Sequence, residues 1–325
     1  MKAPPRISYP LVHSRRLLTT LLTGIVCTAA GLTSANATLL VYEGFDYNLA
    51  NGGILSGVTV SSDTIGLTGK YSYTSSNNAG GSLTPAASEK YTTTGLTFGN
   101  LETSGGALSL KAKSASAVMT VNTTAGSASS AGTYYNSYLI QYDALNTVVP
   151  SGTGPYAGER QNGSSMFSYA YYRNASGTGS MVGSGTPSGN GFGSGFTPSL
   201  NTTYLIVSRY TSSLFEEFVF TLADYNAWVS DGAQESNLYS YYSNYASLAF
   251  GQLNITLGGG GSNTMSFLIQ PQLGELDATM DEMRWGTTLG DVLPMTVPEP
   301  STVALLLGAV GLTFVHSAKR KRSYR

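Results

Sequence analysis

The sequence predicts an all-β protein, an antiparallel sandwich of two sheets with the jelly-roll arrangement. Gly, Ser, Thr, Asn and Tyr dominate the chain, while Lys and Glu are too scarce for a bundle of helices. Short apolar or alternating runs are separated by turn residues, which is typical of strands. Because the strands do not alternate with long helical patterns, a parallel sheet is not expected. Residues 38–294 are enough for one large core, so a single domain is predicted there.

Ten strands are expected, each a run rich in β-branched, aromatic or alternating apolar residues. In chain order they are Leu39–Glu43, Ala107–Ala112, Ala117–Val121, Tyr138–Asp143, Ser165–Tyr172, Tyr204–Tyr210, Phe215–Thr221, Leu253–Leu257, Ser266–Ile269 and Ala278–Trp285. A helix of one or two turns is expected at Leu222–Val229. The glycine-rich stretches 177–195 and 258–263 are expected to be surface loops. Neither is followed by the Lys and the helix that a phosphate-binding loop requires.

The N-terminus has the layout of a secretory signal peptide. Four basic residues among the first 16 precede an apolar core at Leu17–Ala30. Ala35 and Ala37 fit the small-residue pattern at which such peptides are cleaved. Residues 1–37 are therefore predicted to be removed on export, and the mature chain is expected to start at Thr38.

The C-terminus, residues 295–325, has three parts in order. The first is an extended motif made of Val297, Pro298, Glu299 and Pro300. The second, residues 301–318, carries no charge and, at about 1.5 Å per residue, forms a helix long enough to cross most of a bilayer core of roughly 30 Å. The third, residues 319–325, is a basic tail that contains Lys319, Arg320, Lys321 and Arg322. Because basic residues stay in the cytoplasm, the domain is predicted to lie outside the inner membrane.

These three parts resemble the PEP-CTERM sorting signal of Gram-negative bacteria. The resemblance implies recognition by an exosortase, which is a membrane-bound cysteine protease. It also implies a precursor anchored in the inner membrane that later reaches the cell surface or the extracellular matrix. Whether the tail is cleaved or retained stays open. The alternative is an ordinary single-pass tail anchor in which the Pro-Glu-Pro sequence is accidental.

The predicted mature domain is acidic and has neither cysteine nor histidine. Residues 38–298 contain 8 Lys and Arg against 17 Asp and Glu, a net charge of −9. Such a domain is not expected to bind nucleic acid or anionic lipid. Cys27, His13 and His316 all lie in the terminal segments. A Ser-His-Asp or Cys-His nucleophile and the usual zinc sites are therefore excluded from the domain.

Three segments of the domain resemble the concanavalin-A/laminin-G-like jelly-roll domains of bacterial envelope proteins. The opening reads YEGFDY at Tyr42–Tyr47, an interior strand reads YLIVSRY at Tyr204–Tyr210, and the close reads MDEMRWGTT at Met280–Thr288. The chain departs from the family pattern at Leu289, where a tryptophan would follow. The glycine-rich middle is unmatched, so the resemblance implies a fold and no activity.

Two acids near the close of the domain are the best candidates for catalysis. Glu275 and Asp277 alternate, and some jelly-roll glucanases place catalytic carboxylates on alternate residues of one strand. Met280 stands where the third acid of that pattern belongs. The segment is therefore expected to be a polar turn before the last strand, and the protein is predicted not to be an enzyme.

Acids of the same region are also weak candidates for a metal site. Asp277, Asp281 and Glu282 could supply oxygen ligands to Ca²⁺. The family resemblance instead implies that Asp281 and Glu282 pair with an arginine such as Arg284 or cap the sheet. No cofactor is expected, with Ca²⁺ as the alternative.

Tyrosines are clustered, most densely at Tyr239, Tyr241, Tyr242 and Tyr245. An exposed tyrosine ring can stack on a sugar, but tyrosine is also a favoured strand residue that lies half buried. The cluster is therefore a candidate glycan contact, whereas Trp228 and Trp285 are expected in the core.

Together these features predict an exported structural or interaction protein of the cell surface or extracellular matrix. A glycan-binding module of the same fold, with extracellular polysaccharide as its partner, is the alternative. A polysaccharide-cleaving enzyme is the third hypothesis and would require paired acids about 5–9 Å apart in a cleft.

Overall fold

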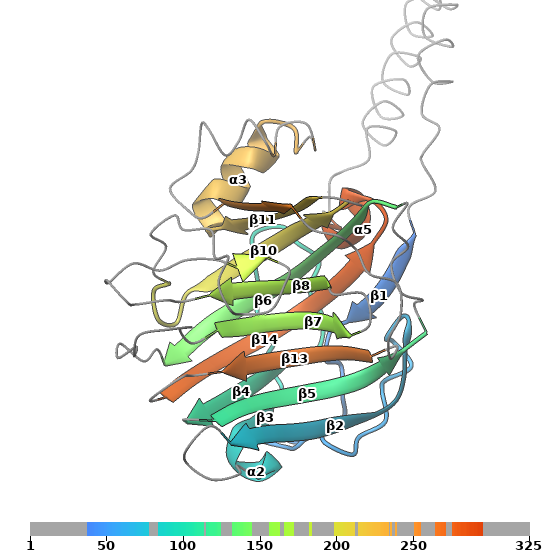
Figure 1. Ribbon diagram of the computed structural model, residues 1–325, viewed down its shortest axis with the longest axis vertical. Coiled ribbons are helices and arrows are strands. Elements are labelled where there is room, and N and C mark those ends of the chain that lie inside the picture. Colours follow the sequence, from blue (N-terminus) through green and yellow to red (C-terminus); the bar gives the residue numbers. More distant parts are fainter. Residues whose placement is uncertain are drawn as a thin grey trace, which may run out of the picture. The chain divides into compact units, whose positions relative to one another are not determined.

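The structure is a computed structural model, and it describes residues 38–77, 84–113, 115–124, 132–144, 156–162, 166–171, 182–183, 198–211, 214–233, 235, 238, 250–254, 264–270 and 275–294. These residues form two antiparallel sheets that pack on each other, so the predicted β-sandwich is confirmed (Figure 1). The predicted signal peptide and the sorting segment 295–325 lie outside the described residues. In the part of the chain that is described, no helix is both long and apolar enough to cross a membrane.

Eight of the described strands form the large sheet. They are β1 (Leu39–Glu43), β3 (Glu89–Thr92), β4 (Ala107–Lys113), β6 (Tyr134–Ala144), β10 (Thr203–Tyr210), β11 (Leu214–Phe220), β12 (Phe250–Asn254) and β14 (Glu275–Gly286). Their order across the sheet is β12-β11-β10-β6-β14-β4-β3, and β1 lies beside β14. The long strand β14 therefore occupies the middle of the sheet.

Six further strands form the small sheet. They are β2 (Leu67–Asn77), β5 (Ala115–Thr123), β7 (Tyr156–Asn162), β8 (Met166–Tyr171), β9 (Val182–Gly183) and β13 (Thr264–Gln270), in the order β2-β5-β13-β7-β8-β9. The chain crosses between the sheets repeatedly, for example from β1 to β2, from β4 to β5 and from β13 to β14. This alternation is the jelly-roll character that the sequence predicts.

Three short helices complete the described fold: α2 (Pro85–Ser88), α3 (Leu222–Ser230) and α5 (Leu289–Val292). The helix α3 begins after Thr221, whose side chain accepts a hydrogen bond from the backbone N–H of Asp224. The helix α5 begins at a capping box in which Thr288 and Asp291 each bond the backbone of the other. The helix α3 confirms the helix predicted at Leu222–Val229.

The large sheet buries apolar side chains on both of its faces. Its inner face packs against the small sheet, with Ile140 and Ile206 on the large sheet and Phe267 on the small one. Part of its outer face is covered by α3, α5 and the segment 96–101, which pack on Leu139, Leu205 and other apolar side chains. Trp228 and Trp285 are 0% and 3% exposed, so their predicted place in the core is confirmed.

Several predicted elements need correction. The segment Glu275–Asp277 is part of β14 and not a turn, because Leu276 is buried and these residues pair with β4. The strand expected at Leu253–Leu257 begins earlier, at Phe250, and its described part Phe250–Asn254 pairs with β11, while residues 255–257 lie outside the described residues. The expected loop 177–195 contains the two residues of β9, which pair with β8. The strands β2, β3 and β7 were not predicted at all.

Candidate functional site

The strand β14 changes its partner halfway along its length. On one edge, Glu275–Met280 pairs with β4 and Met283–Gly286 pairs with β1. Its other edge pairs with β6, with a β-bulge between Asp281 and Arg284. Glu282 lies within this bulge and has a φ of 54°, a left-handed conformation that is costly for a residue with a side chain. Such bulges re-aim side chains, and this one turns two carboxylates toward the segment 93–105.

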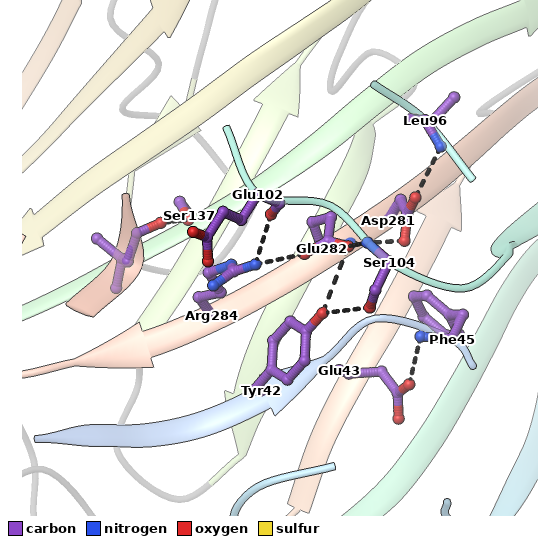
Figure 2. A network of polar contacts seen from close by, with 11 residues as sticks. Tyr42, Glu43, Phe45, Leu96, Glu102, Ser104, Ser137, Asp281, Glu282 and Arg284 are labelled. Carbon is purple, nitrogen blue, oxygen red and sulfur yellow. Dashed lines mark hydrogen bonds and ion pairs between the residues drawn. The ribbon is translucent and has the colours of Figure 1, made fainter. Parts of the chain in front are cut away.

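Glu282 is the centre of a buried polar network (Figure 2). Its Oε2 lies 2.6 Å from Arg284 Nη2, and the two side chains are 0% and 8% exposed. Arg284 also donates to the carbonyl oxygen of Glu102 at 2.7 Å, and its guanidinium lies 4.5 Å from the centre of the Tyr42 ring. The Glu282 Oε1 accepts from the backbone N–H of Ser104 and from the Tyr42 hydroxyl. Burial raises the pKa of Glu282, and the Ser104 N–H and the Arg284 charge oppose this rise.

Asp281 fastens the same segment at a second point. Its Oδ2 accepts from the backbone N–H of Leu96 at 2.7 Å, and its Oδ1 accepts from the N–H of Glu282 at 2.8 Å. A Cβ at Gly95 would lie 2.7 Å from Asp281 Oδ2, so this close approach of the backbone requires glycine. Burial and the neighbouring Glu282 charge raise the pKa of Asp281 well above its usual range.

Glu43 is held on the inner side of the sheet, where β1 faces β2. Its Oε1 accepts from the backbone N–H of Phe45 at 2.6 Å. Its Oε2 accepts from the hydroxyls of Tyr47, at 2.9 Å, and of Tyr71. Burial raises the pKa of Glu43 to about 7, even though the two tyrosines and the Phe45 N–H stabilise the charged form.

We call the set Tyr42, Glu43, Asp281, Glu282 and Arg284 the β1–β14 junction. Its three acids are at most 1% exposed, and each accepts hydrogen bonds from the protein itself. A general acid or nucleophile must reach its substrate, which these carboxyls do not. The junction instead fastens the turn after β1 and the segment 93–105 to the central strand. The expected pairing of Glu282 with Arg284 is confirmed.

The predicted metal ligands do not come together in the described structure. Asp277 lies on the outer face of the large sheet, where it pairs with Lys111, while Asp281 and Glu282 belong to the junction. Among the described residues, no group of three or more His, Cys, Asp or Glu side chains is arranged to hold a metal ion. Calcium binding therefore stays an untested alternative, and the described residues offer no site for it.

The candidate catalytic acid Asp277 has local partners as well. Its Oδ2 lies 3.6 Å from Lys111 Nζ, and its Oδ1 accepts from the Ser109 hydroxyl at 3.5 Å. Met280, at the third position of the glucanase pattern, is 1% exposed in the core between the sheets. Asp277 is thus not joined by an acid at position 280.

The outer face beside Asp277 carries a polar group that the sequence analysis missed. Asp143 accepts from Thr279 Oγ1 at 2.8 Å and from Gln141 Nε2 at 3.0 Å. Gln141 in turn accepts from Thr203 Oγ1 at 3.4 Å. The signal was present in β6, where Gln141 and Asp143 alternate with buried apolar residues. Which residues Gln141 and Asp143 contact, however, depends on the register of the neighbouring strands.

Other predicted site residues lie outside the described residues. These are the glycan candidates Tyr239, Tyr241, Tyr242 and Tyr245, the motif Val297–Pro300, the basic tail and the cleavage site at Ala35 and Ala37. Another tyrosine of the sequence, Tyr135, is 4% exposed and donates to Glu235. Tyr135 is therefore part of the fold and not an open platform.

Comparisons with known proteins identify no family for this chain. No known family profile matches it, and no curated protein matches it. Among solved structures it is similar to domain 4 of AbnA, a GH43 extracellular arabinanase from Geobacillus stearothermophilus, in complex with arabinotriose, at 13% identity and a TM-score of 0.41 over 79% of this chain and 97% of that one. It is also similar to an endo-β-1,4-glucuronan lyase from the fungus Trichoderma reesei, at 10% identity and a TM-score of 0.36 over 79% and 99%.

The chain is similar as well to the binding domain of botulinum neurotoxin DC in complex with rat synaptotagmin II, at 10% identity and a TM-score of 0.35. That match covers 61% of this chain and 45% of the neurotoxin chain. Likenesses this distant say nothing about the activity of this chain.

Proposed function

We propose that this protein is an exported structural or interaction protein of the cell surface or extracellular matrix and that it is not an enzyme. The observation that carries the proposal is that the acids of the β1–β14 junction, and Asp277 on β14, are bound to partners within the fold. Glu43, Asp281 and Glu282 are buried and hydrogen-bonded within the fold, and Asp277 pairs with Lys111. Of the two acids that the sequence offers for catalysis, Asp277 thus has structural partners.

The two ends of the sequence support the route. The predicted signal peptide directs export, and the segment 295–325 resembles a sorting signal that an exosortase would recognise in the inner membrane. A basic tail after an uncharged stretch anchors the precursor with the sandwich outside the cytoplasm. The surface or matrix is then the destination of the sandwich.

The purified chain is expected to release no reducing ends from neutral or acidic polysaccharides. Glu275→Gln and Asp277→Asn should leave this result unchanged, because neither residue is assigned any chemistry. A reducing-end assay on a polysaccharide panel provides the measurement. Cleavage by the parent that either substitution abolishes would show an enzyme and overturn the proposal.

Substitution of Glu299 by alanine is expected to block processing of the tail. The residue lies between two prolines, and a protease subsite that pairs with a carboxylate would lose its specific contact. Fractionation with an antibody to the sandwich should then show a heavier band that stays in the inner membrane. Lys321→Ala, which leaves three basic residues in the 319–322 cluster, is the matched control and should be processed. Normal export of Glu299→Ala would favour the plain tail anchor.

A further inference from the structure

We propose that the outer face of the large sheet binds an uncharged polysaccharide chain along a straight row of polar side chains. The row consists of Lys90, Ser109, Thr279, Gln141 and Thr203, and we call it the polar row. This inference rests on the proposed function, since it names the partner of an exported interaction protein.

The register of the large sheet places these five residues in one line. Lys90 is opposite Ser109, Ser109 is opposite Thr279, Thr279 is opposite Gln141, and Gln141 is opposite Thr203. The row therefore crosses five adjacent strands, β3, β4, β14, β6 and β10. With strands about 4.8 Å apart, it is roughly 19 Å long, which is enough to contact several sugar units of an extended chain.

The row lies on the face that points away from the small sheet. Its neighbours along the strands, such as Leu110, Ala278 and Ile140, point into the core between the sheets, and side chains alternate along a strand. Lys90 is exposed, Ser109, Gln141 and Thr203 are partly exposed, and Thr279 in the middle of the row is 7% exposed. The covering helices and the segment 96–101 pack on other residues of this face, including Leu139 and Leu205.

Hydrogen bonds hold three side chains of the row, Thr279, Gln141 and Thr203, in place in advance of any ligand. Asp143 receives bonds from Thr279 and Gln141, and Gln141 receives one from Thr203. A side chain that is already ordered loses less entropy on binding. Hydroxyl and amide groups both donate and accept, which matches the hydroxyls of a sugar.

The charges of this face favour a neutral ligand. Lys90 and Lys111 balance Asp143 and Asp277, so the row and its margin have no net charge. The whole domain carries a net charge of −9 and repels an acidic polymer. A neutral polysaccharide is not repelled by the charge of the domain and needs no net charge in the row. Its hydroxyls can donate hydrogen bonds to the partly exposed carboxylate of Asp143.

The test is affinity electrophoresis of the full-length chain in native gels with a mild detergent. The gels contain one polysaccharide each, namely β-1,3-glucan, hydroxyethylcellulose, arabinan or galactomannan as neutral chains and alginate or pectate as acidic ones. At least one neutral polysaccharide is expected to slow the parent. The double variant Gln141→Ala with Thr203→Ala should bind it at least tenfold more weakly.

A matched double variant, Asp63→Ala with Lys70→Ala, changes two exposed residues outside the five strands of the row, with Lys70 on β2 of the small sheet, and should bind like the parent. Urea midpoints of both double variants verify that they fold. Binding that survives the row substitutions, binding of acidic polymers only, or no binding at all would overturn the polar row. None of these three results would make the protein an enzyme or stop its export, so the proposed function would fail separately, in the reducing-end and fractionation tests.

Discussion

Replacement of Arg284 by methionine is expected to lower the free energy of unfolding by about 3–5 kcal/mol. The substitution keeps an apolar stem of similar length but leaves the Glu282 carboxylate, whose side chain is 0% exposed, without its counter-charge. It also removes the hydrogen bond to the carbonyl of Glu102. Urea unfolding followed by circular dichroism measures the change, with an unaltered m-value as a sign that the same surface is exposed.

The matched control for this experiment is Lys111→Met. Lys111, on β4, forms an ion pair with Asp277, which is on β14 like Glu282 and Arg284. The Lys111 side chain, however, is 47% exposed. Loss of such a pair costs at most about 1 kcal/mol. An Arg284→Met variant that loses no more than this control would show that the junction does not depend on its ion pair.

A double variant distinguishes the loss of the Glu282–Arg284 attraction from the cost of leaving the Glu282 charge buried and unpaired. Glu282→Gln combined with Arg284→Met removes both charges, so it should be more stable than Arg284→Met alone. The single variant should also recover part of its loss at acid pH, because Glu282 can then take up a proton. A double variant that is less stable than both singles would mean that packing, and not charge, governs the site.

Strands with a dense apolar pattern were predictable from the sequence. β1 was predicted with its observed bounds, and β10 differs by one residue, because both are nearly continuous runs of apolar and aromatic residues. The strand β2 was missed because its buried residues Leu67 and Tyr71 are embedded among glycine, serine and threonine. Its edge is completed by backbone bonds to the segment 57–60, which no local pattern indicates.

The candidate sites were predictable in part. The pairing of Glu282 with Arg284 followed from the family resemblance of the last strand. The bulge did not, since nothing about a glutamate predicts the left-handed φ of Glu282. The partners of Glu43 were also hidden, because Tyr71 lies on the strand that was missed. The polar row depends on the register of five strands, which a single sequence does not specify.

The sandwich is expected to lose stability as the pH rises from about 4.5 to about 7. Burial raises the pKa of Glu43 from its usual 4.5 to about 7, so in this interval the folded protein keeps a proton that the unfolded chain has released. Because the unfolded state binds fewer protons, the free energy of unfolding falls with rising pH, by about 3 kcal/mol for this residue. Burial also raises the pKa of Glu89, Asp281 and Glu282, and each adds a change of the same sign.

The sequence makes this slope unusually easy to measure. Residues 38–294 contain no histidine, so no histidine of the sandwich titrates between pH 5 and 7. Urea unfolding at pH 4.5, 5.5, 6.5 and 7.5 should give the highest midpoint at pH 4.5. Glu43→Gln has no proton to lose there and should show a clearly flatter dependence, whereas Asp63→Asn, at an exposed position, should keep the slope of the parent. Two results would contradict this prediction: a parent that grows more stable up to pH 7, or a Glu43→Gln variant that keeps the full slope. Either would show that Glu43 is charged in the folded protein. The hydroxyls of Tyr47 and Tyr71 would then be sufficient to stabilise a buried carboxylate.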